Sequence, residues 1–293
     1  MSQSIIEIQN LTRRFDKMTA LDNVTLSVPE GGVFGLVGEN GAGKSTLLKH
    51  VLGLLRAESG NVQVFGLDPV TDSVGVLGQI GYLSEDRDMP DWMRVGALMS
   101  YTSAFFPNWD QSFADELREM FDLDLKQKVG SLSRGQKARV GLLLAIAHRP
   151  PLLVLDEPSS GLDPVVRRDI LGAIIRTVAD EGRTVLFSSH LLDEVQRVSD
   201  YVAMLHQGEL VLSQPLDDVL QAHHRLVVRF AEPRDNKPDL QGALRCEGDG
   251  REWTVICNGH REAIEAQIAA GNGEIIERSA PSLDEIFVAR VNA

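Results

Sequence analysis

The stretch Gly38-Glu39-Asn40-Gly41-Ala42-Gly43-Lys44-Ser45-Thr46 decides how the rest of this chain is interpreted. It has the spacing of a phosphate-binding loop, a glycine, four residues, Gly-Lys, and then Ser or Thr. The apolar residues 33–37 before it predict a short buried strand, and residues 46–52 after it predict a helix. Strand, loop and helix in this order are the context that such a loop requires, because loop amides and helix N-terminus then face the same phosphate oxygens.

Each residue type in the loop has a chemical reason. The glycines let the backbone curl so that successive N–H groups point inward. Lys44 is expected to reach the β- and γ-phosphates, and the Ser45 hydroxyl is expected to ligate Mg²⁺. The alternative, a glycine-rich turn that binds nothing, is disfavoured by the flanking strand and helix. We therefore predict a nucleoside triphosphate site made by Gly38, Glu39, Asn40, Gly41, Ala42, Gly43, Lys44, Ser45 and Thr46.

Composition limits the class of protein. The chain has 293 residues, 43% of them hydrophobic and 24% charged, as in ordinary globular proteins. Its net charge of −13 argues against a nucleic-acid-binding surface. No apolar run approaches the roughly 20 residues of a membrane-spanning helix, and residues 1–7 lack the form of a signal peptide. Cys246 and Cys257 predict reduced thiols rather than a disulfide or a metal site, so we expect a cytoplasmic protein.

Hydrophobic patterning predicts an α/β fold. Residues 4–34 alternate as in an antiparallel sheet, with Phe15 in the loop between two strands. A further short strand is expected at 60–66, and strands at 79–85, 152–156 and 184–190 alternate with helices, which favours a mostly parallel sheet covered on both faces. The helices are expected at 109–117, from Ser133 as N-cap, and at 169–180.

Two segments depart from this pattern. Residues 88–132 predict a helical insertion whose aromatic residues mostly form its small core. From residue 221 onward, strands at 226–230, 253–257 and 274–277 and helices at 261–270 and from Ser282 predict a small α+β domain. The expected organisation is a domain of residues 1–220, with an antiparallel β subdomain and the helical insertion, followed by an accessory domain of residues 221–293.

Polar residues stand where the predicted parallel strands end, and ligands of such sheets bind at that edge. Asp156 is placed to hold Mg²⁺ through water, and Glu157 to deprotonate an attacking water, although an acidic pair after a strand also fits a plain turn. His190 could donate to the γ-phosphate or serve as a structural polar residue. Glu85 ends another strand. His223-His224 has no such context, and we interpret it as solvated rather than as a metal site.

Five segments, in this order and spacing, resemble the ATP-binding cassette (ABC) ATPases: 38–46, Leu132-Ser133-Arg134-Gly135-Gln136, 152–158, Ser160-Gly161-Leu162-Asp163 and Ser188-Ser189-His190. The resemblance covers residues 4 to about 218 and implies a phosphate-loop NTPase fold and a Mg²⁺-dependent ATPase. It further implies a head-to-tail dimer in which Ser133, Gly135 and Gln136 of one subunit contact the ATP held by Lys44 of the other.

The same resemblance assigns further roles. Glu157 would be the catalytic base, assisted by His190, and Asp163 would couple the two sites of the dimer. Phe15, which by itself could equally be a core aromatic, would stack on adenine in place of the more usual Tyr. Glu85 would stand at the switch position, facing Mg²⁺ or water, in place of the more usual Gln. Arg134 falls at the variable position of the signature.

A finer resemblance is to ATPase subunits of bacterial exporters whose membrane subunit is a separate chain. It rests on 106–110, on the short insertion and on Pro281-Ser282-Leu283-Asp284-Glu285-Ile286-Phe287. It implies a transmembrane permease partner that docks a helix beside the switch loop, where 86–99, with Trp92 and Met93, would supply part of a groove. The protein would then lie on the inner face of the cell membrane through this partner.

Two alternatives remain at this point. One is a soluble, non-transport ABC ATPase that acts as a mechanical or regulatory module. A single cassette, an acidic surface and the lack of a long coiled-coil insertion speak against it. The other is an ATP-sensing module without turnover, which the presence of Glu157 and His190 disfavours.

Overall fold

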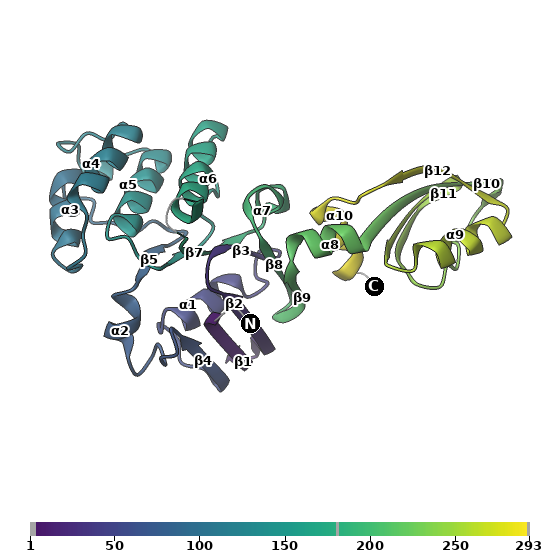
Figure 1. The fold of residues 1–293 in the computed structure, drawn as a ribbon, viewed down its shortest axis with the longest axis horizontal. Coiled ribbons are helices and arrows are strands. Elements are labelled where there is room, and N and C mark those ends of the chain that lie inside the picture. Colours follow the sequence, from purple (N-terminus) through teal and green to yellow (C-terminus); the bar gives the residue numbers. More distant parts are fainter. Residues whose placement is uncertain (1–3, 180–181, 292–293) are drawn as a thin grey trace. The chain divides into compact units, whose positions relative to one another are not determined.

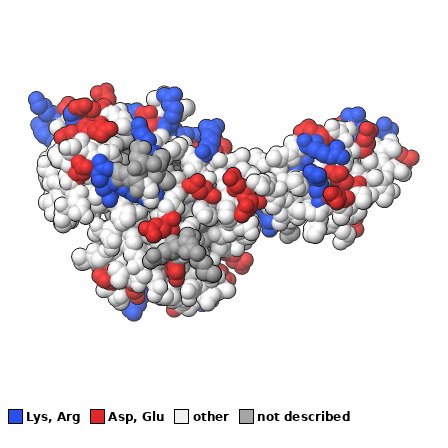
Figure 2. All heavy atoms as spheres, viewed as in Figure 1, with Lys and Arg blue, Asp and Glu red and all other residues white. Residues whose placement is uncertain are grey.

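The computed structural model describes residues 4–179 and 182–291. The chain divides into two compact units, Met1–Leu191 with Val198–Ser213, and Leu192–Arg197 with Gln214–Ala293. No helix in the described ranges is long and apolar enough to cross a membrane. On the face drawn in Figure 2, Lys and Arg side chains are interspersed with Asp and Glu side chains.

A six-stranded sheet forms the centre of the first unit (Figure 1). Its first five strands pair in parallel, and every side chain of the two strands β6 and β7 is buried, as expected for a sheet covered on both faces. The strand order confirms the prediction that four strand ends meet, because the strands before Glu85, Asp156, His190 and the phosphate-binding loop are consecutive neighbours. The order is β5 (Ile80–Leu83), β6 (Leu152–Leu155), β7 (Thr184–Ser189), β3 (Gly32–Val37), β8 (Tyr201–His206) and β9 (Glu209–Pro215).

A second, antiparallel sheet packs beside helix α1 (Lys44–Val51). Its strands lie in the order β2 (Met18–Pro29), β1 (Ser4–Phe15) and β4 (Ser59–Val64). Ile6 and Ile8 enter the core while Glu7 between them is exposed, which confirms the predicted alternation. Phe15 is the last residue of β1, paired with Met18 across the hairpin, so its predicted place in a loop is wrong.

The helical insertion contains α3 (Val95–Ser103), α4 (Gln111–Met120) and the 3₁₀ turn Val129–Ser131, and packs on α5 (Arg134–Ile146). Helix α4 begins as predicted near Trp109, because Asp110 caps it by accepting a hydrogen bond from the Phe113 amide. Aliphatic side chains dominate the buried positions, which are Val95, Leu98, Met99, Ala114, Leu117, Phe121, Leu123, Val129 and Leu132.

The prediction that aromatic residues mostly form this core is wrong. All of residues 88–131 are described, and among their aromatic side chains Phe121 alone is fully buried. Trp92 is 78% exposed, and Tyr101 and Phe105 contact each other edge to face with ring centroids 5.1 Å apart. The short helices bury one narrow face, which smaller residues fill, so the rings find partners at the surface instead.

The remaining helices before β8 are α2 (Ser73–Leu77), α6 (Pro164–Ala179) and α7 (Leu192–Val198), and all of α7 but its last residue belongs to the second unit. Helix α6 begins before the predicted residue 169, because Asp163 caps its first turn through the amides of Val165 and Val166. The predicted end at residue 180 lies outside the described residues.

The second unit is an α+β structure, as predicted. Its antiparallel sheet is ordered β11 (Ala243–Asn258), β10 (His223–Arg234), β12 (Gly273–Ser279), and its helices are α8 (Leu216–Ala222), α9 (Arg261–Ala270) and α10 (Leu283–Val291). Cys246 and Cys257 are free thiols buried in the core between sheet and α9.

His223 differs from its prediction as a solvated residue, since it is only 1% exposed. Its Nδ1–H donates to the Val219 carbonyl at 2.6 Å, and its Nε2 accepts from Arg290 at 3.2 Å. Burial lowers the pKa of His223 and so favours this neutral form. Neighbouring residues of a strand point to opposite faces, so one His of the pair enters the interior while His224 stays half-buried.

Candidate active site

The predicted phosphate-binding loop lies between β3 and α1. Gly43 precedes the helix with a φ of 107°, and a Cβ there would come 2.4 Å from the Ala20 carbonyl oxygen, so only glycine fits. Helix α1 has no side-chain cap and no acidic residue in its first turn. Its first amides are therefore available to an anion.

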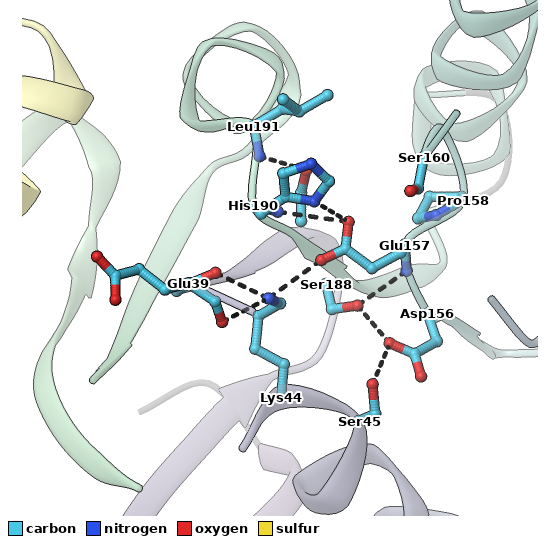
Figure 3. A network of polar contacts seen from close by, with 12 residues as sticks. Glu39, Lys44, Ser45, Asp156, Glu157, Pro158, Ser160, Ser188, His190 and Leu191 are labelled. Carbon is cyan, nitrogen blue, oxygen red and sulfur yellow. Dashed lines mark hydrogen bonds and ion pairs between the residues drawn. The ribbon is translucent and has the colours of Figure 1, made fainter. Parts of the chain in front are cut away.

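Lys44 is the first residue of α1, and its ammonium group lies among oxygen atoms (Figure 3). Its Nζ donates to the carbonyls of Gly38 at 2.7 Å and Glu39 at 3.2 Å, and it lies 3.1 Å from Glu157 Oε1. Both side chains of this ion pair are 5% exposed. A phosphate group bound by Lys44 would therefore lie beside the Glu157 carboxylate.

Lys44 and Glu157 line the same cavity, which has a volume of about 300 Å³. The loop and the start of α1 contribute most of the wall, and Glu85, just after β5, lies at the same cavity although it is distant from the loop in sequence. The lining residues are Met18, Ala20, Asn40, Gly41, Gly43, Lys44, Ser45, Thr46, Glu85 and Glu157. Nearby, burial and then the negative charge of Asp156 raise the pKa of Tyr82 to about 12.

Asp156 connects the loop to two neighbouring strands. One of its oxygens, Oδ1, accepts hydrogen bonds from Ser45 Oγ at 3.1 Å and from Ser188 Oγ at 2.6 Å. Ser188 in turn accepts from the Glu157 amide at 2.9 Å, so a single hydroxyl joins both acidic residues (Figure 3). Sequence reasoning assigned no role to Ser188, although this residue lies on a strand that ends at the site and belongs to the segment Ser188-Ser189-His190.

The oxygens of Ser45 and Asp156 form the donor set that Mg²⁺ prefers, and a Mg²⁺ site needs only one or two protein carboxylates beside substrate phosphates. Residues 4–179 and 182–291 contain no group of three or more His, Cys, Asp or Glu side chains arranged to hold a metal ion by themselves, so Mg²⁺ here would depend on the nucleotide for further ligands.

Glu157 is held from two sides in a backbone conformation that favours glycine. Its φ is 46°, and such strained positions persist where surrounding contacts over-determine them, often at active sites. Lys44 contacts one carboxylate oxygen, and His190 Nδ1 lies 2.7 Å from the other. Because a carboxylate only accepts hydrogen bonds, Nδ1 of His190 carries the proton. The arrangement presents a buried carboxylate of fixed direction to the cavity.

The other predicted site residues lie elsewhere in the chain. Ser133 and Gln136 form a reciprocal capping box at the start of α5, and Gly135 packs against Val166. Phe15 lies under the Arg13 guanidinium, 4.7 Å from the ring centroid. Asp163 caps α6, as described above. In the part of the chain that is described, none of these residues lines the cavity of the loop.

Known proteins are similar to this chain in sequence and in fold. A family model described as ABC transporter matches residues 21–160. The uncharacterised ABC transporter ATP-binding protein YhaQ of Bacillus subtilis is 30% identical, with 99% of each chain covered. The bacitracin transport ATP-binding protein BcrA of Bacillus licheniformis is 30% identical over 80% of this chain and 77% of its own. A solved ATP-binding subunit of an ABC transporter superposes with a TM-score of 0.68 at 26% identity, covering 74% of this chain and 92% of that one.

Proposed function

This chain belongs to the ATP-binding proteins of ABC transporters, which are ATPases, and from that premise we propose how its residues bind and hydrolyse ATP. The amides of Gly38–Thr46 and of the uncapped α1 N-terminus hold the phosphates, and Lys44 contacts the β- and γ-phosphates. Phe15, exposed at the end of β1, stacks on adenine. Ser45 and Asp156 hold Mg²⁺, with Glu85 facing the metal ion or a water.

The 3.1 Å contact between Lys44 and Glu157 carries this proposal. A terminal phosphate bound by Lys44 would lie beside Glu157, where this carboxylate would orient a water and accept its proton. His190 fixes the direction of the carboxylate through Nδ1–H. When bound, Mg²⁺ would neutralise charge that develops on the phosphate oxygens.

Replacing the base without changing its shape tests this assignment. In Glu157→Gln, binding of a fluorescent ATP analogue should stay within about twofold of wild type, while the hydrolysis rate falls by about 100-fold or more, the scale of lost general-base catalysis. Glu116→Gln, an exposed change on α4, serves as the control and should hydrolyse ATP normally. Undiminished hydrolysis in Glu157→Gln would contradict the role of this residue.

We further propose that two copies pair head to tail. The signature residues Ser133, Gly135 and Gln136 are exposed or half-buried and do not line the cavity of their own loop, as far as the described residues show. In a dimer they would close over the ATP of the opposite copy, and Asp163, exposed at the start of α6, would couple the two sites. Light scattering of Glu157→Gln with ATP should then report a dimer, and a monomer at saturating ATP would contradict the pairing.

A hollow between β5, the helical insertion and α5 supports a partner on a separate chain. It has a volume of about 470 Å³, and apolar side chains of β5, α3 and α5 dominate its wall, among them Ile80, Leu83, Leu98 and Leu144. Asp88, Met89 and Pro90 belong to the predicted groove segment 86–99, whereas Trp92 and Met93 are not in the wall. We propose that this hollow receives a helix of a transmembrane permease, which would hold the ATPase at the inner face of the membrane of an exporter.

A pull-down from native cells tests the partner. The tagged chain, extracted with mild detergent in the presence of ATP, should retain one multi-span membrane protein at matching stoichiometry, identified by mass spectrometry. Leu98→Glu places a charge in the hollow and should abolish retention, while Glu116→Gln should keep it. Capture of ribosomal or chromosomal proteins with no membrane partner would instead favour a non-transport module.

A further inference from the structure

Arg87 is a buried arginine to which the roles above assign nothing. It follows Glu85 by two residues at the end of β5, is 4% exposed, and has a left-handed backbone with a φ of 51°. Arginine is among the residues least often buried, and a buried guanidinium needs acceptors for its N–H groups. Burial, followed by the positive charge of Arg134, lowers the pKa of Arg87, whereas Glu85 acts in the opposite direction.

The acceptors of Arg87 belong to the turn that follows the catalytic base. Its Nη2 donates to the carbonyl oxygens of Pro158 at 3.0 Å and Ser160 at 3.2 Å. Pro158 comes directly after Glu157, and both Pro158 and Ser160 lie beside the polar network in Figure 3. A charged donor shared by two carbonyls that lie two positions apart fixes the path of the backbone that follows Glu157.

A second arginine bounds the same turn. Gly161 has a φ of 64°, and Nη1 of Arg134 lies 2.3 Å from the position that a Cβ at Gly161 would take. Arg134 is the variable residue of the signature segment and opens α5. The turn after Glu157 is therefore bounded by guanidinium groups from the segment after β5 and from the signature helix.

Arg87 also forms part of the wall of the docking hollow, together with Asp88, Met89 and Thr102. The Arg87 side chain thus lines the hollow and also contacts, through its guanidinium, the turn that follows Glu157. We infer that Arg87 is a positioning residue that places Glu157 for hydrolysis and transmits the filling of the hollow to that turn. This inference rests on the proposed function, since it takes Glu157 as the base and the hollow as the docking site.

The first test separates ATP binding from turnover in the full chain, with MgATP as the probe. Arg87→Met removes the donors but keeps an unbranched stem, and should lower kcat by about ten- to hundredfold, the range for a small displacement of a catalytic group. Affinity for ATP should change by less than about twofold, because Arg87 does not line the cavity of the loop. Arg87→Lys, which retains a charged donor, should recover part of kcat.

The control is Arg139→Met, which removes a different arginine contact, the partly exposed ion pair of Nη2 with Asp169 Oδ2 at 2.6 Å, away from the turn. Its kcat should stay within about twofold of wild type. Unchanged kcat in Arg87→Met, or equal losses in Arg87→Met and Arg139→Met, would overturn the positioning role. If Arg87→Met fails to bind ATP, Arg87→Lys becomes the deciding variant. Lysine cannot reproduce the planar donor geometry of arginine, so a kcat equal to wild type in Arg87→Lys would also count against the positioning role of Arg87.

The second test introduces a larger side chain into the hollow from α3. Thr102→Trp adds bulk to the wall on α3 without touching the turn, and should change kcat by about threefold or more in the wild-type background but by less than about 1.5-fold in Arg87→Met. If Thr102→Trp changes kcat by the same factor in the wild-type and Arg87→Met backgrounds, or changes it in neither, Arg87 does not transmit the filling of the hollow. Failure of the proposed function would give a different result. In that case the wild-type chain would not hydrolyse ATP, or Glu157→Gln would hydrolyse it as fast as wild type.

Discussion

Ser188→Ala is the substitution whose effect the structure predicts most fully. The Ser188 side chain is completely buried, donates to Asp156 Oδ1 at 2.6 Å and accepts from the Glu157 amide at 2.9 Å. A hydrogen bond to a charged group contributes about 1.5–3 kcal/mol and one between neutral groups about 0.5–1.5 kcal/mol. Alanine removes both bonds and leaves the buried Glu157 amide without its acceptor, so the free energy of unfolding of the first unit should fall by about 2–4 kcal/mol.

Two measurements check this prediction. For a unit of this size 1 kcal/mol corresponds to about 2–4 °C, so the Tm in differential scanning calorimetry should fall by about 4–16 °C. The Mg²⁺ concentration that gives half-maximal ATP hydrolysis should rise by about 10- to 100-fold, since Asp156 loses the partner that orients its carboxylate.

The neighbouring Ser189 is the matched control. It is equally buried, but its hydroxyl accepts only from the Leu191 amide at 3.0 Å among the contacts described. Ser189→Ala should therefore lower the Tm by a smaller amount and leave the Mg²⁺ requirement within about twofold of wild type. If Ser188→Ala also keeps the wild-type Mg²⁺ requirement, or if the two variants shift it equally, Ser188 does not orient Asp156 and the reasoning is refuted.

Three further predictions follow from buried or strained groups. Gly161→Ala should lower the Tm and reduce hydrolysis, because alanine is disfavoured at a φ of 64° by about 1–2 kcal/mol and its methyl group would meet Arg134; wild-type activity would show that this turn adapts freely. Burial raises the pKa of the Cys246 thiol to about 11, so native protein at pH 8 should react with a thiol reagent far more slowly than urea-unfolded protein, and equal rates would contradict the buried core. Burial lowers the pKa of His148, so its contribution to stability is complete above about pH 6.5 and is lost as the pH falls through the lowered pKa. His148→Gln should therefore show a smaller decline in Tm between pH 7 and pH 5 than wild type. An identical decline in the two proteins would refute this contribution.

Local sequence patterns predicted most of the secondary structure. Period-two alternation identified β1 and β2, apolar runs identified the parallel strands β3, β5, β6 and β7 but not β8, and Ser133 marked the start of α5. These signals are local because side-chain periodicity and helix caps depend on residues only a few positions apart. The same argument placed Glu85, Asp156, Glu157 and His190 at one edge, since the carboxyl ends of neighbouring parallel strands must meet there.

Predictions from local patterns were wrong where the burial of a side chain depended on which face of its helix or strand the rest of the protein covers. The aromatic residues of the insertion look like core residues by type, yet Trp92, Tyr101 and Phe105 are exposed because shorter aliphatic chains fill the narrow buried faces. His223 looks like a polar surface residue by type, yet strand geometry turns it inward to Val219 and Arg290. Residue type is a weak guide to burial when an element has only one small covered face.

The sequence by itself determined the loop, the strand and helix that flank it, and the edge of the sheet at which the candidate site lies. Only the tertiary structure showed that Lys44 meets Glu157, that the Ser188 hydroxyl joins Asp156 to the Glu157 amide, and that Arg87 holds the turn after the base. Hydrogen bonds and ion pairs require atoms to lie within about 3 Å, and no pattern along the chain specifies such distances between segments that are far apart in sequence. Those distances are set by the packing of the sheet against its helices.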